Sequence, residues 1–219
     1  MTLDLDPDRR LALAYASAAA RPALEALWRL DVTFASVLAT GRDRMVGRIR
    51  LAWWSEALER LDREASPPEL VLRALQAHVL PAGIAGAELA AMAEGWEILL
   101  AEEPLDAGAL GNYAAGRGGA LFALSSRLLG DSRRTVDRAG ASWALVDLAR
   151  HSSNADEARL ALEEAARLAD DALWPRRLRP LGMLSVLTLR DLRRGAGSWE
   201  SPGSPGRMLR MLRHRLTGT

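Results

Sequence analysis

Residues 43–63 read DRMVGRIRLAWWSEALERLDR, and this stretch decides the fold class. Its apolar residues recur every three to four positions, which is the spacing of an amphipathic α-helix. They cover more than half of the helix circumference and are Val46, Ile49, Leu51, Trp53, Trp54, Leu58 and Leu61. A helix with so wide an apolar surface is typical of the interior of a bundle. We therefore expect residues 43–63 to be buried in the body of a helical protein.

The rest of the chain has the same helical periodicity, and the period-two alternation of strands is almost absent. Asp6 and Pro7 form an N-cap followed by proline at the first helical position, which predicts a helix from there to about residue 20. A second helix is predicted from Pro22 to a break at Gly41. Further helices are predicted at 68–79, 85–101, 106–130, 133–151, 155–173 and 178–194. The predicted fold class is all-α.

Composition excludes several classes of function. The 219 residues include 29 Lys+Arg and 28 Asp+Glu, so the net charge is only +1 and nucleic-acid binding is not expected. The absence of cysteine excludes disulfides, thiolate metal sites and cysteine nucleophiles. The three histidines are scattered, which argues against a histidine metal site. No apolar run is long enough to span a membrane and the N-terminus is acidic, so we expect a cytoplasmic protein, with peripheral attachment to the inner membrane as the alternative.

Asp31 is the first candidate functional residue. It follows Leu27 by four residues and precedes Phe34 by three, which places its carboxylate on the apolar face of a helix. A buried carboxylate needs a cationic or hydrogen-bonding partner. Two interpretations stay open: a structural salt bridge inside the bundle, or a polar group that lines an internal cavity. Arg50 is a candidate partner for Asp31 or for a ligand phosphate.

A pair of tryptophans follows Arg50. Arg50 and Trp54 are four residues apart on a helix, close enough for a cation–π contact. With the flanking arginines, Trp53 and Trp54 would suit the wall of a lipid or isoprenoid cavity. They would equally suit two large core positions.

A glycine-rich stretch and a charged helix supply the remaining candidates. Residues 113–119 read YAAGRGG within a helical pattern, and they match neither a P-loop nor a dinucleotide-binding fingerprint. Glycines in such a position permit a kink or a close approach of two helices. Further along, Asp147 and Arg150 are three residues apart, a spacing common for ion pairs on helix surfaces.

Four stretches together resemble the squalene/phytoene synthase family: 26–31 (ALWRLD), 47–58 (GRIRLAWWSEAL), 113–119 and 140–150 (GASWALVDLAR). More closely, the chain is similar to the short, divergent alphaproteobacterial branch of that family, which is related to a mitochondrial complex I assembly factor. The resemblance runs from about residue 10 to residue 216. It implies an isoprenoid-synthase-like helical bundle around a central cavity. Active members condense two prenyl diphosphates head to head with Mg²⁺ as cofactor.

The chain departs from this family where the metal would bind. Active members hold Mg²⁺ with two aspartate-rich motifs on facing helices, because carboxylates bind hard cations that in turn hold diphosphate. In an ungapped placement the first motif falls on Ala35, Ser36 and Ala39. The second falls on His151 and Ala155. The resemblance therefore implies the scaffold without the metal cluster.

A few residues near the second motif qualify this placement. Asp147 takes the position of a family asparagine, and Arg150 matches a family arginine. Asp156 and Glu157 are near enough for a shifted alignment to restore one acidic site. The chain is also shorter than active members.

We divide the sequence into a helical domain at 1–194, a Gly/Pro/Ser-rich linker at 195–206 and a basic amphipathic segment at 207–219. This last segment has apolar residues on one side and no acidic residue, a pattern that suits association with anionic lipid. A terminal helix docked on the bundle would fit equally well. The predicted membrane-contact residues are Arg207, Arg210, Arg213 and Arg215.

Three hypotheses follow. In the first, the protein is non-catalytic, needs no cofactor, and binds a prenyl or other lipid ligand or partners in respiratory-complex assembly. In the second, it is an active Mg²⁺-dependent prenyl transferase in which Asp31, Asp156 and Glu157 converge. In the third, it is a helical module that contacts a protein or a membrane. The cavity-lining candidates are Asp31, Arg50, Trp53, Trp54, Tyr113, Arg117, Asp147 and Arg150.

Overall fold

The computed structural model describes residues 4–40, 43–131, 135–171 and 173–218, and within these ranges it contains helices and no β-strand. This confirms the all-α fold class and is consistent with the isoprenoid-synthase fold. Short 3₁₀ turns lie at Leu80–Ala82, Ile98–Leu100 and Arg176–Leu178, and a π turn at Ala115–Gly119. The α-helices are α1 (Pro7–Ala14), α2 (Arg21–Thr40), α3 (Arg44–Arg60), α4 (Leu70–His78), α5 (Gly86–Glu97), α6 (Ala107–Ala114), α7 (Ala120–Leu128), α8 (Thr135–His151), α9 (Ala155–Leu168), α10 (Arg179–Arg194) and α11 (Pro205–Thr217).

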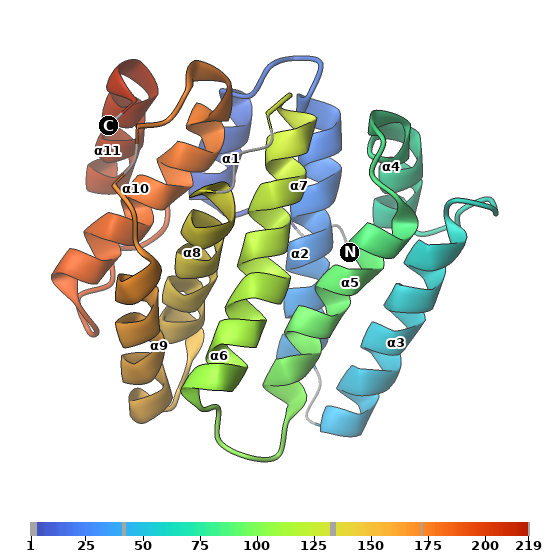
Figure 1. Ribbon diagram of the computed structural model, residues 1–219, viewed down its shortest axis with the longest axis horizontal. Coiled ribbons are helices and arrows are strands. Elements are labelled where there is room, and N and C mark those ends of the chain that lie inside the picture. The colour runs from blue at the N-terminus through green and yellow to red at the C-terminus, as the bar shows by residue number, and fades with distance from the viewer. Residues whose placement is uncertain (1–3, 41–42, 132–134, 172, 219) are drawn as a thin grey trace.

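The helices lie side by side in a broad bundle, with α3 at one end of its long axis and α10 and α11 at the other (Figure 1). Helix α2 contacts α1, α3, α4, α5 and α7 and so supplies much of the core. Its Trp28 is almost completely buried and donates from Nε1 to the Ser125 hydroxyl at 2.9 Å, which joins α2 to α7. The apolar face on which the sequence places Leu27, Asp31 and Phe34 is therefore part of the central packing surface.

Helix α1 is shorter than the sequence predicts. It begins as expected, because the Asp6 carboxylate accepts from the backbone N–H groups of Asp8 and Arg9. It ends at Ala14 rather than near residue 20. The Ser17 hydroxyl and carbonyl both accept from the Ala20 N–H, and serine side chains of this kind compete with helix continuation.

The glycine-rich stretch at 113–119 includes the end of α6 and the π turn that joins α6 to α7, and it does not interrupt the helical path. The predicted close approach of helices is confirmed here. A Cβ atom built on Gly118 would lie 2.1 Å from the carbonyl oxygen of Gly140, and one on Gly140 would lie equally close to that of Gly118. Only glycine at both positions allows α8 to pack directly on the π turn.

Helix α3 lies at the edge of the bundle, so the expectation that it is buried in the body is wrong. It contacts α5 and α2 on one side only. Its buried residues include Leu51, Trp54 and Leu58, and the Trp54 ring packs 6.2 Å from that of Phe34. Its other side is open and exposes Met45, Val46, Ile49 and Trp53.

Candidate functional site

Asp31 is the centre of a charged network inside the bundle. Its side chain has 0% exposure, and four N–H groups donate to its carboxylate. Arg9 Nη2 and Arg117 Nη2 donate to Oδ2 at 2.9 and 3.2 Å. Arg117 Nε and Trp96 Nε1 donate to Oδ1 at 3.0 and 3.2 Å. Because a carboxylate has about four lone-pair sites, protein donors saturate this one.

Arg117 connects the rest of the network from the middle of the π turn. Its Nη1 donates to the Tyr113 hydroxyl, and its Nη2 lies 2.7 Å from Asp147 Oδ2. The guanidinium carbon is 4.1 Å from the ring centroid of Trp96 and 5.0 Å from that of Trp143. Aromatic rings therefore cover a cation whose charge is shared between two carboxylates.

Opposing charges fix the protonation of these groups. Burial acts to raise the pKa of Asp31, but Arg117 and Arg9 outweigh it and hold that pKa below its usual range. The pKa of Asp147 is lowered in the same way, against burial, by Arg117 and Arg9. Burial raises the pKa of the Tyr113 hydroxyl well above its usual value. Both carboxylates are therefore ionised at neutral pH, and the tyrosine is neutral.

A small pocket of about 120 Å³ adjoins this network. Asp147 borders it and retains 27% exposure of its side chain, whereas Asp31 is sealed. His151 also borders it, with Nδ1 at 2.8 Å from the backbone carbonyl of Asp147. The charged residues along its wall are Asp6, Asp8, Arg9, Asp147, Arg150, Asp191 and Arg207.

The size and lining of this pocket favour a small polar occupant. Pockets for drug-sized ligands are mostly apolar and measure about 300–1,000 Å³. At about 120 Å³ the pocket has room for several waters or a small polar group but is too small for a prenyl chain, although Trp143, Val146, Leu184 and Leu187 add apolar surface to its charged wall. Arg9 contributes a buried Nη1 that has no hydrogen-bond acceptor within the described structure and could donate to such an occupant.

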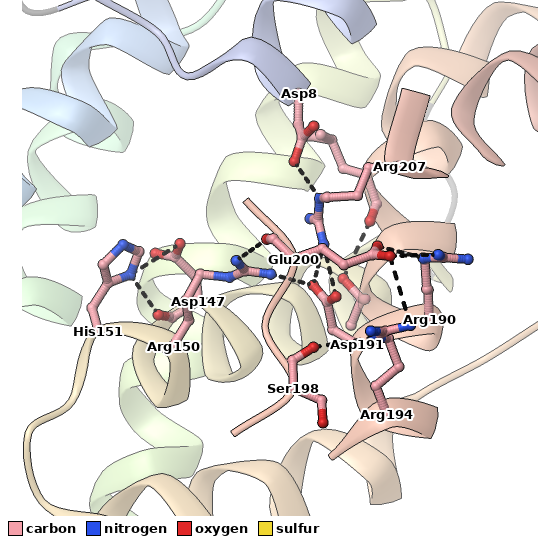
Figure 2. A network of polar contacts seen from close by, with 12 residues as sticks. Asp8, Asp147, Arg150, His151, Arg190, Asp191, Arg194, Ser198, Glu200 and Arg207 are labelled. Atoms are coloured by element: carbon pink, nitrogen blue, oxygen red, sulfur yellow. Dashed lines mark hydrogen bonds and ion pairs between the residues drawn. The ribbon is translucent and has the colours of Figure 1, made fainter. Parts of the chain in front are cut away.

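A second network also contributes to the wall of this pocket. It joins the C-terminal part of the chain to α1 and α8 (Figure 2). Asp191 on α10 accepts from Arg207 Nη1 at both oxygens, at 2.7 and 2.8 Å, and from Arg150 Nη2 at 2.9 Å. Arg207 Nε also donates to Asp8 Oδ2 at 2.8 Å. One guanidinium thus bridges the first and last helices of the bundle.

The segment between α10 and α11 is bound to the same network (Figure 2). Arg190 donates from Nε and Nη2 to the two carboxylate oxygens of Glu200, at 2.8 and 2.7 Å. The Glu200 backbone carbonyl accepts from Arg150 Nη1 at 2.7 Å. The Arg150 guanidinium lies 4.9 Å from the Trp199 ring centroid. The predicted linker is therefore held against α8 and α10.

The structure brings together most of the polar residues that the sequence singled out. Asp31, Tyr113, Arg117 and Asp147 all belong to the first network. Arg150 belongs to the second network and borders the same pocket. Of the two interpretations of Asp31, its sealed environment matches an internal salt bridge, whereas Asp147 and Arg150 line the pocket.

Arg50 and Trp53 lie away from these networks and do not line the pocket beside Asp147, whereas Trp53 borders a separate pocket of about 90 Å³. Both are exposed on the outer side of α3, where Trp53 retains 47% of its surface. The proposed pairing of Arg50 with Asp31 is wrong, because Arg9 and Arg117 already occupy that carboxylate. Trp54, the remaining candidate of this segment, is a core residue, as described above.

The arginines of the C-terminal segment do not form one exposed face. Arg207 is 6% exposed and bound to Asp191 and Asp8, so its assignment to membrane contact is wrong: release would leave the buried Asp8 carboxylate without its cation. Arg210 and Arg215 are half-buried, and Arg213 is exposed. Among the described helices, none is long and apolar enough to cross a bilayer.

Sequence reasoning missed Arg9, Trp96 and Asp191. Asp191 carried a usable signal, because it follows the buried Leu187 by four residues and so lies on the apolar face of its helix, as Asp31 does. Arg9 precedes the buried Leu13 by four residues and carried the same signal. Nothing in the sequence around Trp96 pointed to a role as a hydrogen-bond donor.

The described residues do not fit a magnesium–diphosphate site. They contain no group of three or more His, Cys, Asp or Glu side chains that could hold a metal ion. The convergence of Asp31 with Asp156 that an active enzyme would require is also wrong. Asp156 is 91% exposed in the first turn of α9, whereas Asp31 has no exposure. No step through Mg²⁺ can be derived from this arrangement.

A model of the squalene/phytoene synthase family matches residues 4–159, which is more than two thirds of the chain. No curated protein and no solved structure matches it. The matched residues contain every member of the Asp31 network. Asp191 and Arg207, at the centre of the second network, lie beyond the match. With most of its length matched, the chain belongs to the squalene/phytoene synthase family.

Proposed function

We propose that this protein keeps the helical scaffold of its family but does not condense prenyl diphosphates. In this proposal both aspartate-rich motifs have been lost, and the protein works as a non-catalytic binding protein or assembly factor. It needs no metal cofactor for that role.

The saturation of Asp31 carries the proposal. A Mg²⁺ ion requires carboxylate oxygens with free lone pairs, and it demands near-octahedral geometry. The four N–H donors on Asp31 leave no lone pair for a metal. The same Arg117 guanidinium also pairs with Asp147. An internal arginine therefore supplies the positive charge at both Asp31 and Asp147.

The positions that an ungapped placement assigns to the first metal motif support the same conclusion. Ala35, Ser36 and Ala39 lie on α2 within the two turns that follow Asp31, and none carries a carboxylate. Residues at the second placement include His151, whose Nδ1 faces the backbone carbonyl of Asp147. A diphosphate there would meet no cluster of metal-binding side chains.

We further propose what this protein binds. We place the chain in the short branch of the family that is related to a mitochondrial complex I assembly factor, with assembly partners or a lipid as its ligand. The pocket of about 120 Å³ is small and charged, which favours a protein partner over a prenyl chain held next to Asp147.

The test is a pyrophosphate-release assay with farnesyl and geranylgeranyl diphosphates, run with Mg²⁺ and with a chelator. We expect no release above the protein-free background under either condition. Thermal unfolding recorded in the same samples reports binding separately from turnover, because a ligand that binds only the folded state raises the unfolding temperature.

An active squalene/phytoene synthase family enzyme, assayed in parallel, serves as the positive control. Release by this protein that requires Mg²⁺ and stops with chelator would overturn the proposal. Stabilisation without release would identify a retained prenyl-binding site, and the absence of both would direct the search to protein partners.

A further inference from the structure

The outer side of α3 carries a stripe of exposed apolar side chains. Met45, Ile49 and Trp53 follow one another at intervals of four residues, so they lie along one side of the helix. They are 58, 62 and 47% exposed, and Val46 beside them is 39% exposed. Single exposed apolar residues are ordinary, but a continuous row on one helix marks a contact surface.

Arginines border this stripe on both sides. With about 100° of rotation per residue, Arg48 lies to one side of Ile49 and Arg50 to the other. Arg44 lies one turn before Arg48. Residues 44–55 contain these three arginines and no aspartate or glutamate. Arg44 and Arg50 are exposed, and Arg48 is half-buried and donates to the Leu100 carbonyl at 3.1 Å.

We propose that this face of α3 docks the protein on an anionic lipid surface. The face is defined by Met45, Val46, Ile49 and Trp53 together with Arg44, Arg48 and Arg50. A helix that lies in the membrane interface buries apolar side chains among the acyl chains and places basic side chains at the headgroups. Tryptophan is enriched at that boundary, because its ring is amphipathic.

The same observations disfavour two other occupants. A second copy of the chain, docked by two-fold symmetry, would place the arginines of one α3 against those of the other. A stable protein interface takes about 800 Å² from each partner, whereas this stripe spans roughly 12 Å of one helix at the end of the molecule (Figure 1). A lipid surface requires only that a convex edge inserts a few side chains.

Helix α11 provides a matched comparison at the opposite end of the bundle (Figure 1). Its Leu209 and Leu216 are 70 and 78% exposed, as much as the stripe on α3. They are separated by seven residues, and the first arginine of the helix is bound within the protein. A truncation of α11 would break the Arg207–Asp191 pair, so point substitutions are the better test.

The experiment is sedimentation with vesicles of phosphatidylcholine alone or of phosphatidylcholine mixed with an equal amount of phosphatidylglycerol. The full chain should bind the anionic vesicles and not the neutral ones, and high salt should weaken binding. The double variant Met45→Gln/Ile49→Gln should bind at least about tenfold more weakly, since two apolar side chains no longer leave water. Both positions are exposed, so its unfolding temperature should match that of the parent.

The control is Leu209→Gln/Leu216→Gln, which removes the same kind of side chain from α11 and should bind within about twofold of the parent. For charge, Arg44→Gln should weaken binding roughly fivefold, as expected for about 1 kcal/mol per arginine near an anionic surface, and Arg213→Gln should not. Several results would overturn the proposal. These are no binding to anionic vesicles, equal binding to neutral vesicles, or a loss of vesicle binding in the α11 variants but not in the α3 variants. Self-association through α3, detected by sedimentation velocity without vesicles, would do the same.

Discussion

Arg117 and Arg207 each bridge two carboxylates from distant parts of the chain, but the networks around them differ in how far they extend toward solvent. The Arg117 side chain is 2% exposed, pairs with a carboxylate of 0% exposure and is enclosed by aromatic rings. The Arg207 network also has a buried pair at its centre, but it extends through Arg150 and Arg190 to a Glu200 side chain that is 20% exposed.

The two networks also hold different parts of the molecule. The first links α1, α2, α5, α8 and the π turn, all within the residues matched by the family model. The second attaches α10, α11 and the segment between them to α1 and α8, and its central residues lie beyond that match. We infer that the first network supports the whole scaffold, whereas the second supports the docking of the C-terminal part.

Substitution of Asp31 should have the largest effect. Asp31→Asn removes the negative charge that balances Arg117 and leaves a buried guanidinium without its main partner. Loss of one member of a buried ion pair costs about 3–5 kcal/mol, so we expect the free energy of unfolding to fall by that amount. Urea denaturation followed by circular dichroism measures it.

A surface substitution of the same chemistry is the control for this prediction. Asp156→Asn changes an aspartate that is 91% exposed and should leave the unfolding midpoint nearly unchanged. If Asp31→Asn does not fold, Tyr113→Phe removes only the hydroxyl that accepts from Arg117 Nη1 and should cost about 1–2 kcal/mol. A parent-like midpoint for both buried variants would contradict a supporting role for this network.

Low pH should destabilise the first network, as Asp31→Asn is expected to do. The pKa values of Asp31 and Asp147 are lowered in the folded protein, so their contribution to stability is complete above the ordinary aspartate pKa of about 3.9. It is lost as the pH falls through the lowered values. Urea midpoints between pH 7 and about pH 3 should therefore fall more steeply for the parent than for Asp31→Asn, which lacks one titrating group. Parallel curves would contradict this.

Asp191→Asn should act locally. Asp191 accepts three hydrogen bonds from Arg207 and Arg150, and charged hydrogen bonds are worth about 1.5–3 kcal/mol. We expect amide hydrogens of α11 to lose protection by about 2–3 kcal/mol, while those of α2 and α8 keep theirs. Hydrogen exchange read by mass spectrometry separates the two regions.

The control for that substitution is Asp171→Asn, because the Asp171 side chain is 65% exposed and lies 4.0 Å from its arginine neighbour. It should leave protection of α11 unchanged. Equal loss of protection across the whole chain in Asp191→Asn would show that the two networks form one cooperative unit.

The helical periodicity of the sequence was sufficient for the fold class and for most helix positions. α10, predicted at 178–194, is observed at Arg179–Arg194. The error at the end of α1 arose from local competition by Ser17, which periodicity does not record. The error at α3 arose because the sequence shows how much apolar surface a helix has. It does not show whether a neighbouring helix buries that surface.

The candidate site could be predicted only in part. Helical phase placed Asp31 on an apolar face and so predicted that it needs a partner. The identity of that partner was beyond reach, because Arg9 and Arg117 come from helices whose rotation about α2 is set by packing, such as the contact of Gly118 with Gly140. Arg50, the predicted candidate partner, lies instead on the exposed side of α3.

Glu200→Gln should lower the free energy of unfolding least. It tests whether burial, rather than the number of hydrogen bonds, decides how much each network contributes to stability. Arg190 donates two short hydrogen bonds to Glu200, and this pairing lowers the pKa of that carboxyl. Both side chains are partly exposed, so water competes for them, and exposed pairs contribute less than about 1 kcal/mol. That small loss should shrink further at high salt, because exposed charges are screened. The cost of Asp31→Asn should stay constant, since salt does not reach a sealed pair. If the two costs respond equally to salt in urea denaturation, the difference in burial has no energetic consequence.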